Sequence, residues 1–242
     1  MIISKSKNAL ELGNAAGKLA AEKINEAIKK QGSARIILST GASQFETLQA
    51  LIKEDVDWSK VEMFHLDEYV NLSEAHPASF RKYLKERFAN LINLKKAYFV
   101  DGNNVEETIK YLTDEITKAP IDVALIGIGE NAHIAFNDPP ADFDTKESYI
   151  VVNLDEKCRM QQVGEGWFAT IDDVPKQAIS MTPYRIMQSK VIISAVPHAV
   201  KANAIKLVME NDVTNTVPAT LLKTHDDMYL FVDENSAGDA IK

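Results

Sequence analysis

The feature that most constrains this chain is a run of apolar and glycine residues near its middle, VALIGIG, at Val123–Gly129. A strand with one face in water alternates polar and apolar side chains, and this run has no such alternation. Strands that are buried on both faces are typical of parallel sheets, which carry helices on each face. The run therefore predicts a parallel sheet between helical layers.

Apolar runs and helical patterns alternate along the rest of the chain. Further strands are expected at 34–38, 61–66, 97–100, 149–154, 190–196 and 228–232. Helices are expected at about 7–30, 44–53, 79–90, 105–118 and 200–210. This order predicts an α/β fold, with a mostly parallel sheet in a three-layer α/β/α arrangement.

We expect one domain over residues 1–242, because no internal repeat, low-complexity tract or linker interrupts the alternation. A chain of 242 residues is long enough to bury a full core. The segment 138–148 is polar and contains prolines. We interpret it as an active-site loop rather than as a domain boundary.

Charge and cysteine content argue against several classes of protein. The chain has 27 Lys and Arg against 35 Asp and Glu, a net charge of −8, and no basic run interleaved with aromatic residues. Nucleic acid is therefore not an expected partner, whereas a small anion in one local positive pocket is compatible with this charge. The only cysteine, Cys158, gives neither a disulfide framework nor a thiolate metal cluster. With no signal-peptide pattern at the start and no apolar stretch near ~18 residues, we predict a cytoplasmic protein without a membrane partner.

The turn Ser39–Ser43 follows the predicted strand 34–38 and opens a helix. Ligands of open α/β sheets bind beyond the carboxyl ends of the strands. Small residues let a ligand approach the backbone, and free N–H groups at a helix start attract anions such as phosphate. An ordinary N-cap with a tight turn explains the same residues, so both interpretations stay open.

Asp67 and Glu68 follow the predicted strand 61–66. Successive strand residues face opposite sides, so we expect one of the two carboxylates to point into a pocket. A partly buried carboxylate has a raised pKa and can accept a proton. The alternative is that the pair caps the next turn.

His133 and Lys201 also lie beyond predicted strand ends. Asp138 comes five residues after His133, and a carboxylate beside an imidazole fixes its tautomer and makes it more basic. A structural histidine is the alternative, and one histidine with scattered carboxylates predicts no metal site. Lys201 begins a helix, where its charge opposes the helix dipole, and this favours a bound anion.

The chain carries, in this order, STGAS (39–43), LDEY (66–69), GIGENAHIAFNDP (127–139), VPKQAIS (174–180) and VKANA (200–204). Together these segments resemble the glucosamine-6-phosphate deaminase family, also called glucosamine-6-phosphate isomerases. The wider superfamily includes the 6-phosphogluconolactonases, whose segment after the histidine reads Thr and Ser rather than the Ile-Ala-Phe-Asn found here. The resemblance implies a modified Rossmann-like fold with no nicotinamide cofactor.

The resemblance also implies roles for individual residues. Asp67 matches the base that moves a proton between sugar carbons C1 and C2, and His133 matches the histidine that opens the pyranose ring. Asp138 and Asn131 match the partners of that histidine. Thr40, Gly41, Ser43 and Lys201 match the family's phosphate-binding positions. Ser39, Glu68 and Gly129 are further candidates for substrate contacts.

Some positions depart from the family pattern. Asn131 stands where many members have Asp, and Asp138 stands where Glu is usual. Ala132 replaces the usual Gly before His133. Gly166 falls where many members have an arginine that contacts the phosphate, and His198 and Arg159 are candidates to replace it. These changes leave open whether the amino sugar is glucosamine 6-phosphate or galactosamine 6-phosphate.

Three functions follow as hypotheses. The first is a metal-independent amino-sugar-6-phosphate deaminase/isomerase that acts as a monomer or homo-oligomer on a phosphorylated amino sugar. The second is a lactone hydrolase of the 6-phosphogluconolactonase type, in which His133 activates water. The third is a sugar-phosphate sensor without turnover.

Overall fold

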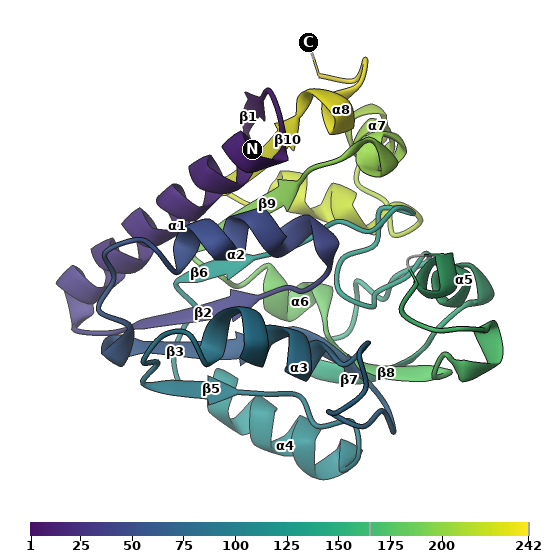
Figure 1. Ribbon diagram of the computed structural model, residues 1–242, viewed down its shortest axis with the longest axis horizontal. Helices are drawn as coiled ribbons and strands as arrows, with labels where there is room; N and C mark the ends of the chain where they lie inside the picture. The colour runs from purple at the N-terminus through teal and green to yellow at the C-terminus, as the bar shows by residue number, and fades with distance from the viewer. Residues whose placement is uncertain (165, 242) are drawn as a thin grey trace.

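A seven-stranded parallel sheet forms the centre of the molecule in the computed structural model, which describes residues 1–164 and 166–241. Its strand order is β1-β10-β9-β6-β2-β3-β5, and every neighbouring pair is parallel (Figure 1). The strands are β1 (Ile2–Ser6), β2 (Ala34–Leu38), β3 (Val61–His65), β5 (Lys96–Tyr98), β6 (Val123–Leu125), β9 (Val191–Val196) and β10 (Met228–Asp233). The predicted parallel sheet is confirmed.

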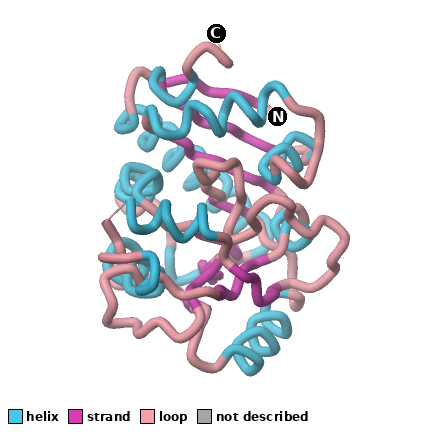
Figure 2. Tube along the Cα trace, turned by 90° about the vertical axis from the view of Figure 1, so that its right-hand side faces the viewer, coloured by secondary structure: helices cyan, strands magenta, loops and turns pink. Residues whose placement is uncertain are grey.

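Helices cover both faces of this sheet (Figure 2). They are α1 (Ala9–Gln31), α2 (Phe45–Leu51), α3 (Phe80–Leu84), α4 (Val105–Ile116), α5 (Glu156–Gly164), α6 (Pro183–Ile186), α7 (Ala202–Glu210) and α8 (Glu234–Ala237). Successive residues of β2 point to opposite faces of the sheet. Ile36 and Leu38 pack against α1 and α2 on one face, and Ile37 packs against the core that contains α4 and α7 on the other. The three-layer α/β/α arrangement is confirmed.

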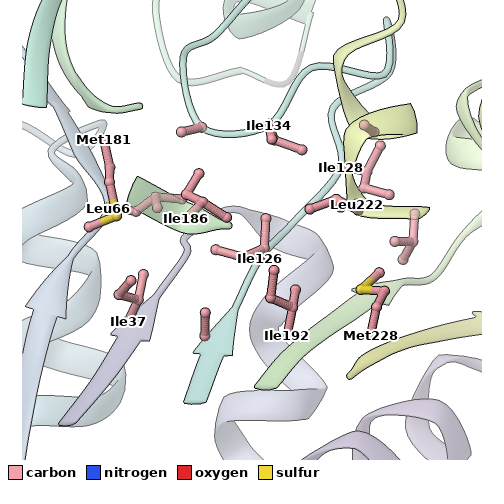
Figure 3. Packing of buried hydrophobic residues seen from close by; sticks show 14 of the residues in the cluster. Ile37, Leu66, Ile126, Ile128, Ile134, Met181, Ile186, Ile192, Leu222 and Met228 are labelled. Atoms are coloured by element: carbon pink, nitrogen blue, oxygen red, sulfur yellow. The ribbon is translucent and has the colours of Figure 1, made fainter. Parts of the chain in front are cut away.

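A second, three-stranded antiparallel sheet was not predicted. It consists of β4 (Asp67–Tyr69), β8 (Gln177–Met181) and β7 (Tyr149–Asn153), in that order. The predicted strand 61–66 is thus wrong at its end, because the chain leaves the large sheet after His65 and joins the second sheet at Asp67. Figure 3 shows Leu66 and Met181, from this junction and from β8, packed near Ile37 of the large sheet.

Several predicted boundaries also differ from the structure. The strand in VALIGIG ends at Leu125, and the chain from Ile126 onward turns toward the cavity described below. The predicted helix 79–90 is divided into α3 and a π-helical turn, Lys85–Ala89. Strands β1 and β8 were missed. Within the described residues, we find no helix with the length and apolarity that crossing a bilayer requires.

Helices α1 and α2 touch through glycine. A Cβ atom on Gly13 would overlap Glu46 and the backbone nitrogen of Thr47, so the two helices approach closely only because Gly13 has no side chain. Overpacking of a filled interior typically costs about 1–3 kcal/mol.

We therefore predict that Gly13→Ala lowers the free energy of unfolding by about 1–3 kcal/mol, measured by denaturant titration. Asn14→Ala is the matched control, because Asn14 is exposed on the same helix. The control should stay within about 0.5 kcal/mol of the wild type. A Gly13→Ala protein as stable as the wild type would contradict this account of the helix contact.

Candidate active site

One cavity of about 480 Å³ lies beyond the carboxyl ends of the parallel strands. Its walls come from the turn after β2, the start of β4, the segment 77–83 that leads into α3, the loop after β6, the turn after β9, and the end of α5 with the residues that follow it. Of the predicted site residues, it is lined by Ser39, Thr40, Gly41, Ser43, Asp67, Gly129, His133 and Lys201. The strand ends therefore meet at one cavity, as the sequence predicted.

Asp67 is the first residue of β4 and is only 5% exposed. Burial, and then the charge of Glu68, hold the pKa of the Asp67 carboxyl well above its ordinary value. Within residues 1–164 and 166–241, no side chain or backbone N–H donates a hydrogen bond to this carboxylate. A carboxylate without such a donor, on the wall of a cavity, is suited to accept a proton from a bound molecule.

Glu68 faces away from the cavity, so only one of the two carboxylates lines it, as predicted. The Glu68 carboxylate accepts hydrogen bonds from Ser79 Oγ at 2.8 Å and from the backbone nitrogens of Arg81 and Phe80 at 2.9 and 3.2 Å. These bonds join the end of β4 to the start of α3. A contact between Glu68 and substrate stays a prediction; in the structure its carboxylate makes these contacts with α3.

His133 and Asp138 form a pair. The imidazole Nδ1 lies 3.0 Å from Asp138 Oδ1, which leaves Nε2 as the ring nitrogen available to a ligand. Asn131 Nδ2 donates to the same carboxylate oxygen at 3.1 Å, and Asn131 Oδ1 accepts from the backbone nitrogen of His133 at 3.1 Å. Burial alone would raise the pKa of Asp138, but the adjacent His133 imidazole, with Asn131 and the Cys158 thiol, holds it below its ordinary value. Asp138 and Asn131 stand behind His133 rather than on the cavity wall.

The backbone around His133 is shaped for its ring. Gly129 lies against the imidazole, where a Cβ atom would overlap the ring atoms, so only glycine leaves room for His133 in this position. Ala132 has a φ of 63°, in the left-handed region that favours glycine. This conformation explains why a glycine would suit the position that Ala132 occupies.

Strand β8 holds the loop that carries His133. Asn137 Nδ2 donates to the carbonyl oxygen of Met181 at 2.8 Å and to that of Ile134 at 2.8 Å. Ser180 Oγ accepts from the backbone nitrogen of Phe136 at 3.1 Å. The segment 174–180 was identified only through the family resemblance, and its pairing with β4 could not be read from its residues.

The turn Ser39–Ser43 and Lys201 form another part of the wall. Gly41 has a φ of 101°, which a residue with a side chain rarely adopts. Tyr83 Oη donates to the Gly41 carbonyl oxygen at 2.8 Å and so holds the turn. Lys201 is 8% exposed and ends the short turn before α7.

The candidates for the missing arginine differ in position. His198 lines the cavity, whereas Arg159 donates to the carbonyl oxygen of Ile171 and lies outside the cavity wall. Gly166 is exposed and also lies outside it. Arg159 is therefore wrongly proposed as a replacement for the family arginine, because its guanidinium group donates a hydrogen bond to the turn that follows α5.

Sequence reasoning missed the wall that comes from α5 and from the residues just after it. Gln161, Gln162 and Trp167 line the cavity there. No motif or spacing in the sequence singles out these residues, because a helix after an antiparallel strand is not expected at the ligand edge of a parallel sheet. Among the described residues, no group of three or more His, Cys, Asp or Glu side chains could hold a metal ion.

Comparison with known proteins agrees with this geometry. Residues 7–230 match the family model of glucosamine-6-phosphate isomerases/6-phosphogluconolactonase. A glucosamine-6-phosphate deaminase of Streptococcus pyogenes is 36% identical over 223 residues, which are 91% of this chain and 93% of that protein. One of Streptococcus equi subsp. zooepidemicus is 33% identical over 241 residues, 99% of each chain.

Two solved structures are similar in fold. A monomeric glucosamine-6-phosphate deaminase superposes with a TM-score of 0.89 at 28% identity, and the match covers 100% of both chains. A putative 6-phosphogluconolactonase from Neisseria gonorrhoeae gives a TM-score of 0.75 at 19% identity, covering 97% of this chain and 100% of the other. The second likeness is one of fold alone.

The pKa of Asp67 leads to a prediction about stability. At a pH above the ordinary carboxyl pKa, Asp67 is charged in the unfolded chain, where water solvates the charge. Folding must either bury that charge or protonate the carboxyl, so Asp67 lowers the free energy of unfolding. Asp67→Asn should therefore raise the melting temperature at neutral pH. The gain should vanish as the pH falls below the ordinary carboxyl pKa, because Asp67 is then protonated in both states.

Asp57→Asn is the control for this comparison. Asp57 is exposed, and its hydrogen bonds from Ser59 and Lys60 lower its pKa, so its replacement should not stabilise the protein at neutral pH. Thermal unfolding at several pH values measures both variants. An Asp67→Asn protein that melts below the wild type at neutral pH would contradict the burial argument.

Proposed function

Because this chain belongs to the family of glucosamine-6-phosphate isomerases and 6-phosphogluconolactonases, we propose that it is a deaminase/isomerase of an amino sugar 6-phosphate. The products are the 2-ketose 6-phosphate and ammonia. The observation that carries the proposal is that Asp67, without a donor among the described residues, shares one cavity with the His133–Asp138 pair.

The first step in this proposal opens the sugar ring. Ring opening moves a proton between the ring oxygen O5 and the hydroxyl oxygen at C1, and His133 Nε2 is the nitrogen free to do this while Nδ1 stays beside Asp138. Asp138, with its low pKa, remains a carboxylate that stabilises the imidazole in this orientation. Asn131 holds that carboxylate in place.

The second step moves a proton between carbons. The open-chain aldehyde makes the C2 hydrogen acidic, and Asp67 accepts that proton to give an enolamine. Return of a proton to C1 gives an imine at C2, and addition of water to that imine releases ammonia and leaves the ketone. General-base help of this kind typically contributes ~10²–10⁴ in rate.

The phosphate group supplies binding that is remote from the reacting carbons. We assign it to the turn Ser39–Ser43 and to Lys201, because they supply small residues and a buried cation to the same cavity. His198 lies on the wall beside Lys201 and can add to this part of the site.

Glucosamine 6-phosphate is the substrate we propose, because the relatives at 33–36% identity carry the name glucosamine-6-phosphate deaminase. Galactosamine 6-phosphate differs only at C4 and is the first alternative to test. A lactone hydrolase is the second, and its support is a likeness of fold at 19% identity or less.

A paired assay tests the proposed function. The purified protein is incubated with glucosamine 6-phosphate or galactosamine 6-phosphate, and in parallel with 6-phosphogluconolactone. Equal amounts of ammonia and ketose 6-phosphate from an amino sugar are the expected result. Hydrolysis of the lactone without release of ammonia would overturn the proposal, and so would tight binding of the sugar phosphate without any product.

Lys201→Ala should act on substrate binding. A charge-assisted contact to phosphate is worth about 1.5–3 kcal/mol, so we predict that KM for the amino sugar phosphate rises at least ~10-fold. Lys206→Ala is the matched control, since Lys206 is 61% exposed on α7 and should leave KM unchanged. Steady-state kinetics measure both, and an unchanged KM in Lys201→Ala would remove Lys201 from the phosphate site.

A further inference from the structure

Helix α5 brings a carboxamide into the cavity. Gln162 is 7% exposed, lies in the last turn of α5, and forms part of the cavity wall together with Asp67 and His133. The proton transfers described above do not use it. A buried polar side chain on the wall of a ligand cavity calls for a hydrogen-bonding partner.

Tyr69 fixes the orientation of this carboxamide. Tyr69 Oη donates to Gln162 Oε1 at 2.8 Å, and the Tyr69 side chain is completely buried. Its ring packs against Phe80, Phe136 and Phe168, with centroid distances of 5.2, 5.1 and 5.6 Å. Because these contacts hold the tyrosine, they also hold the oxygen end of the Gln162 amide.

The nitrogen end of the amide is left for a ligand. With Oε1 bound to Tyr69, Nε2 keeps two N–H donors, and no acceptor for them lies among residues 1–164 and 166–241. Nε2 is not one of the fully buried polar atoms that lack a partner. It is therefore accessible from the cavity that Gln162 lines. Gln162 therefore offers the cavity a donor of fixed direction.

We propose that Gln162 Nε2 donates a hydrogen bond to a hydroxyl oxygen of the bound sugar, and that Tyr69 is a positioning residue for it. The inference rests on the proposed function, since it names a further contact for the same substrate. The phosphate is assigned to other residues of the cavity wall, Ser39–Ser43 and Lys201, and a protonated amine cannot accept a hydrogen bond. The ring oxygen and the oxygen at C1 are assigned to His133, so the hydroxyl groups on the other sugar carbons are the acceptors that remain for Gln162.

Tyr69 also links this contact to the base. Asp67 and Tyr69 are two residues apart on β4, so their side chains leave the same face of the strand. One short strand thus places the proton acceptor and orients the donor that holds the sugar. A hydrogen bond at one hydroxyl group restricts the orientations of the sugar in the cavity, and this helps to keep its C2 hydrogen near Asp67.

The test compares two substitutions of Gln162. Gln162→Leu removes both ends of the amide, whereas Gln162→Glu keeps an oxygen for Tyr69 and removes the donor. Loss of one such hydrogen bond should lower kcat/KM for glucosamine 6-phosphate about 10-fold in both variants. If Gln162 served only as the partner of Tyr69, Gln162→Glu would restore activity. Gln188→Glu, at an exposed glutamine after α6, is the matched control and should match the wild type.

Inorganic phosphate supplies a second readout. It probes only the phosphate part of the cavity, so its inhibition constant should be the same in the wild type and in both Gln162 variants. A structural collapse of the cavity would change this constant together with kcat/KM. The melting temperature of each variant checks that the fold is retained.

Tyr69→Phe tests the positioning role. It should lower kcat/KM less than Gln162→Leu does, and it should add no further loss when combined with Gln162→Leu, because Tyr69 acts through Gln162. Additive losses would overturn the positioning role. If the wild type turns over normally and Gln162→Leu has the same kcat/KM as the wild type, this inference alone is overturned. A wild type that releases no ammonia would overturn the proposed function and this inference with it.

Discussion

Burying a carboxylate without a hydrogen-bond donor lowers the free energy of unfolding. Asp67 is buried, and none of the residues that the structure describes donates a hydrogen bond to its carboxylate. The apolar cores on both faces of the large sheet provide the stability that tolerates it. The same burial gives the carboxylate a raised pKa and therefore a higher affinity for a proton. The position of Asp67 is thus the constraint around which the other walls of the cavity are arranged.

The second sheet is what makes this position possible. The chain leaves the large sheet after His65, and Asp67 pairs with Ser180 of β8 rather than with another parallel strand. The same strand holds the loop of His133, through Asn137 and Ser180. The two groups to which we assign proton transfer therefore depend on one strand, so a change in β8 should disturb both.

Much of this arrangement could be predicted because it follows from local pattern. The buried run at Val123–Gly129 indicated the parallel sheet, and the five-residue spacing of His133 and Asp138 suggested their contact. Strand β8 and the Tyr69–Gln162 contact could not be predicted, because each depends on pairing between segments far apart in the chain. The single domain over residues 1–242 stays a prediction.

The central claim is that Asp67 takes the C2 proton of the amino sugar. Glucosamine 6-phosphate with deuterium at C2, followed by NMR, tests it most directly in the wild type and in Asp67→Asn. We expect the wild type to remove the deuterium from C2 as ammonia is released. We expect Asp67→Asn, correctly folded, to do so ~10²–10⁴ times more slowly. Removal of the deuterium by Asp67→Asn at the wild-type rate would contradict the account.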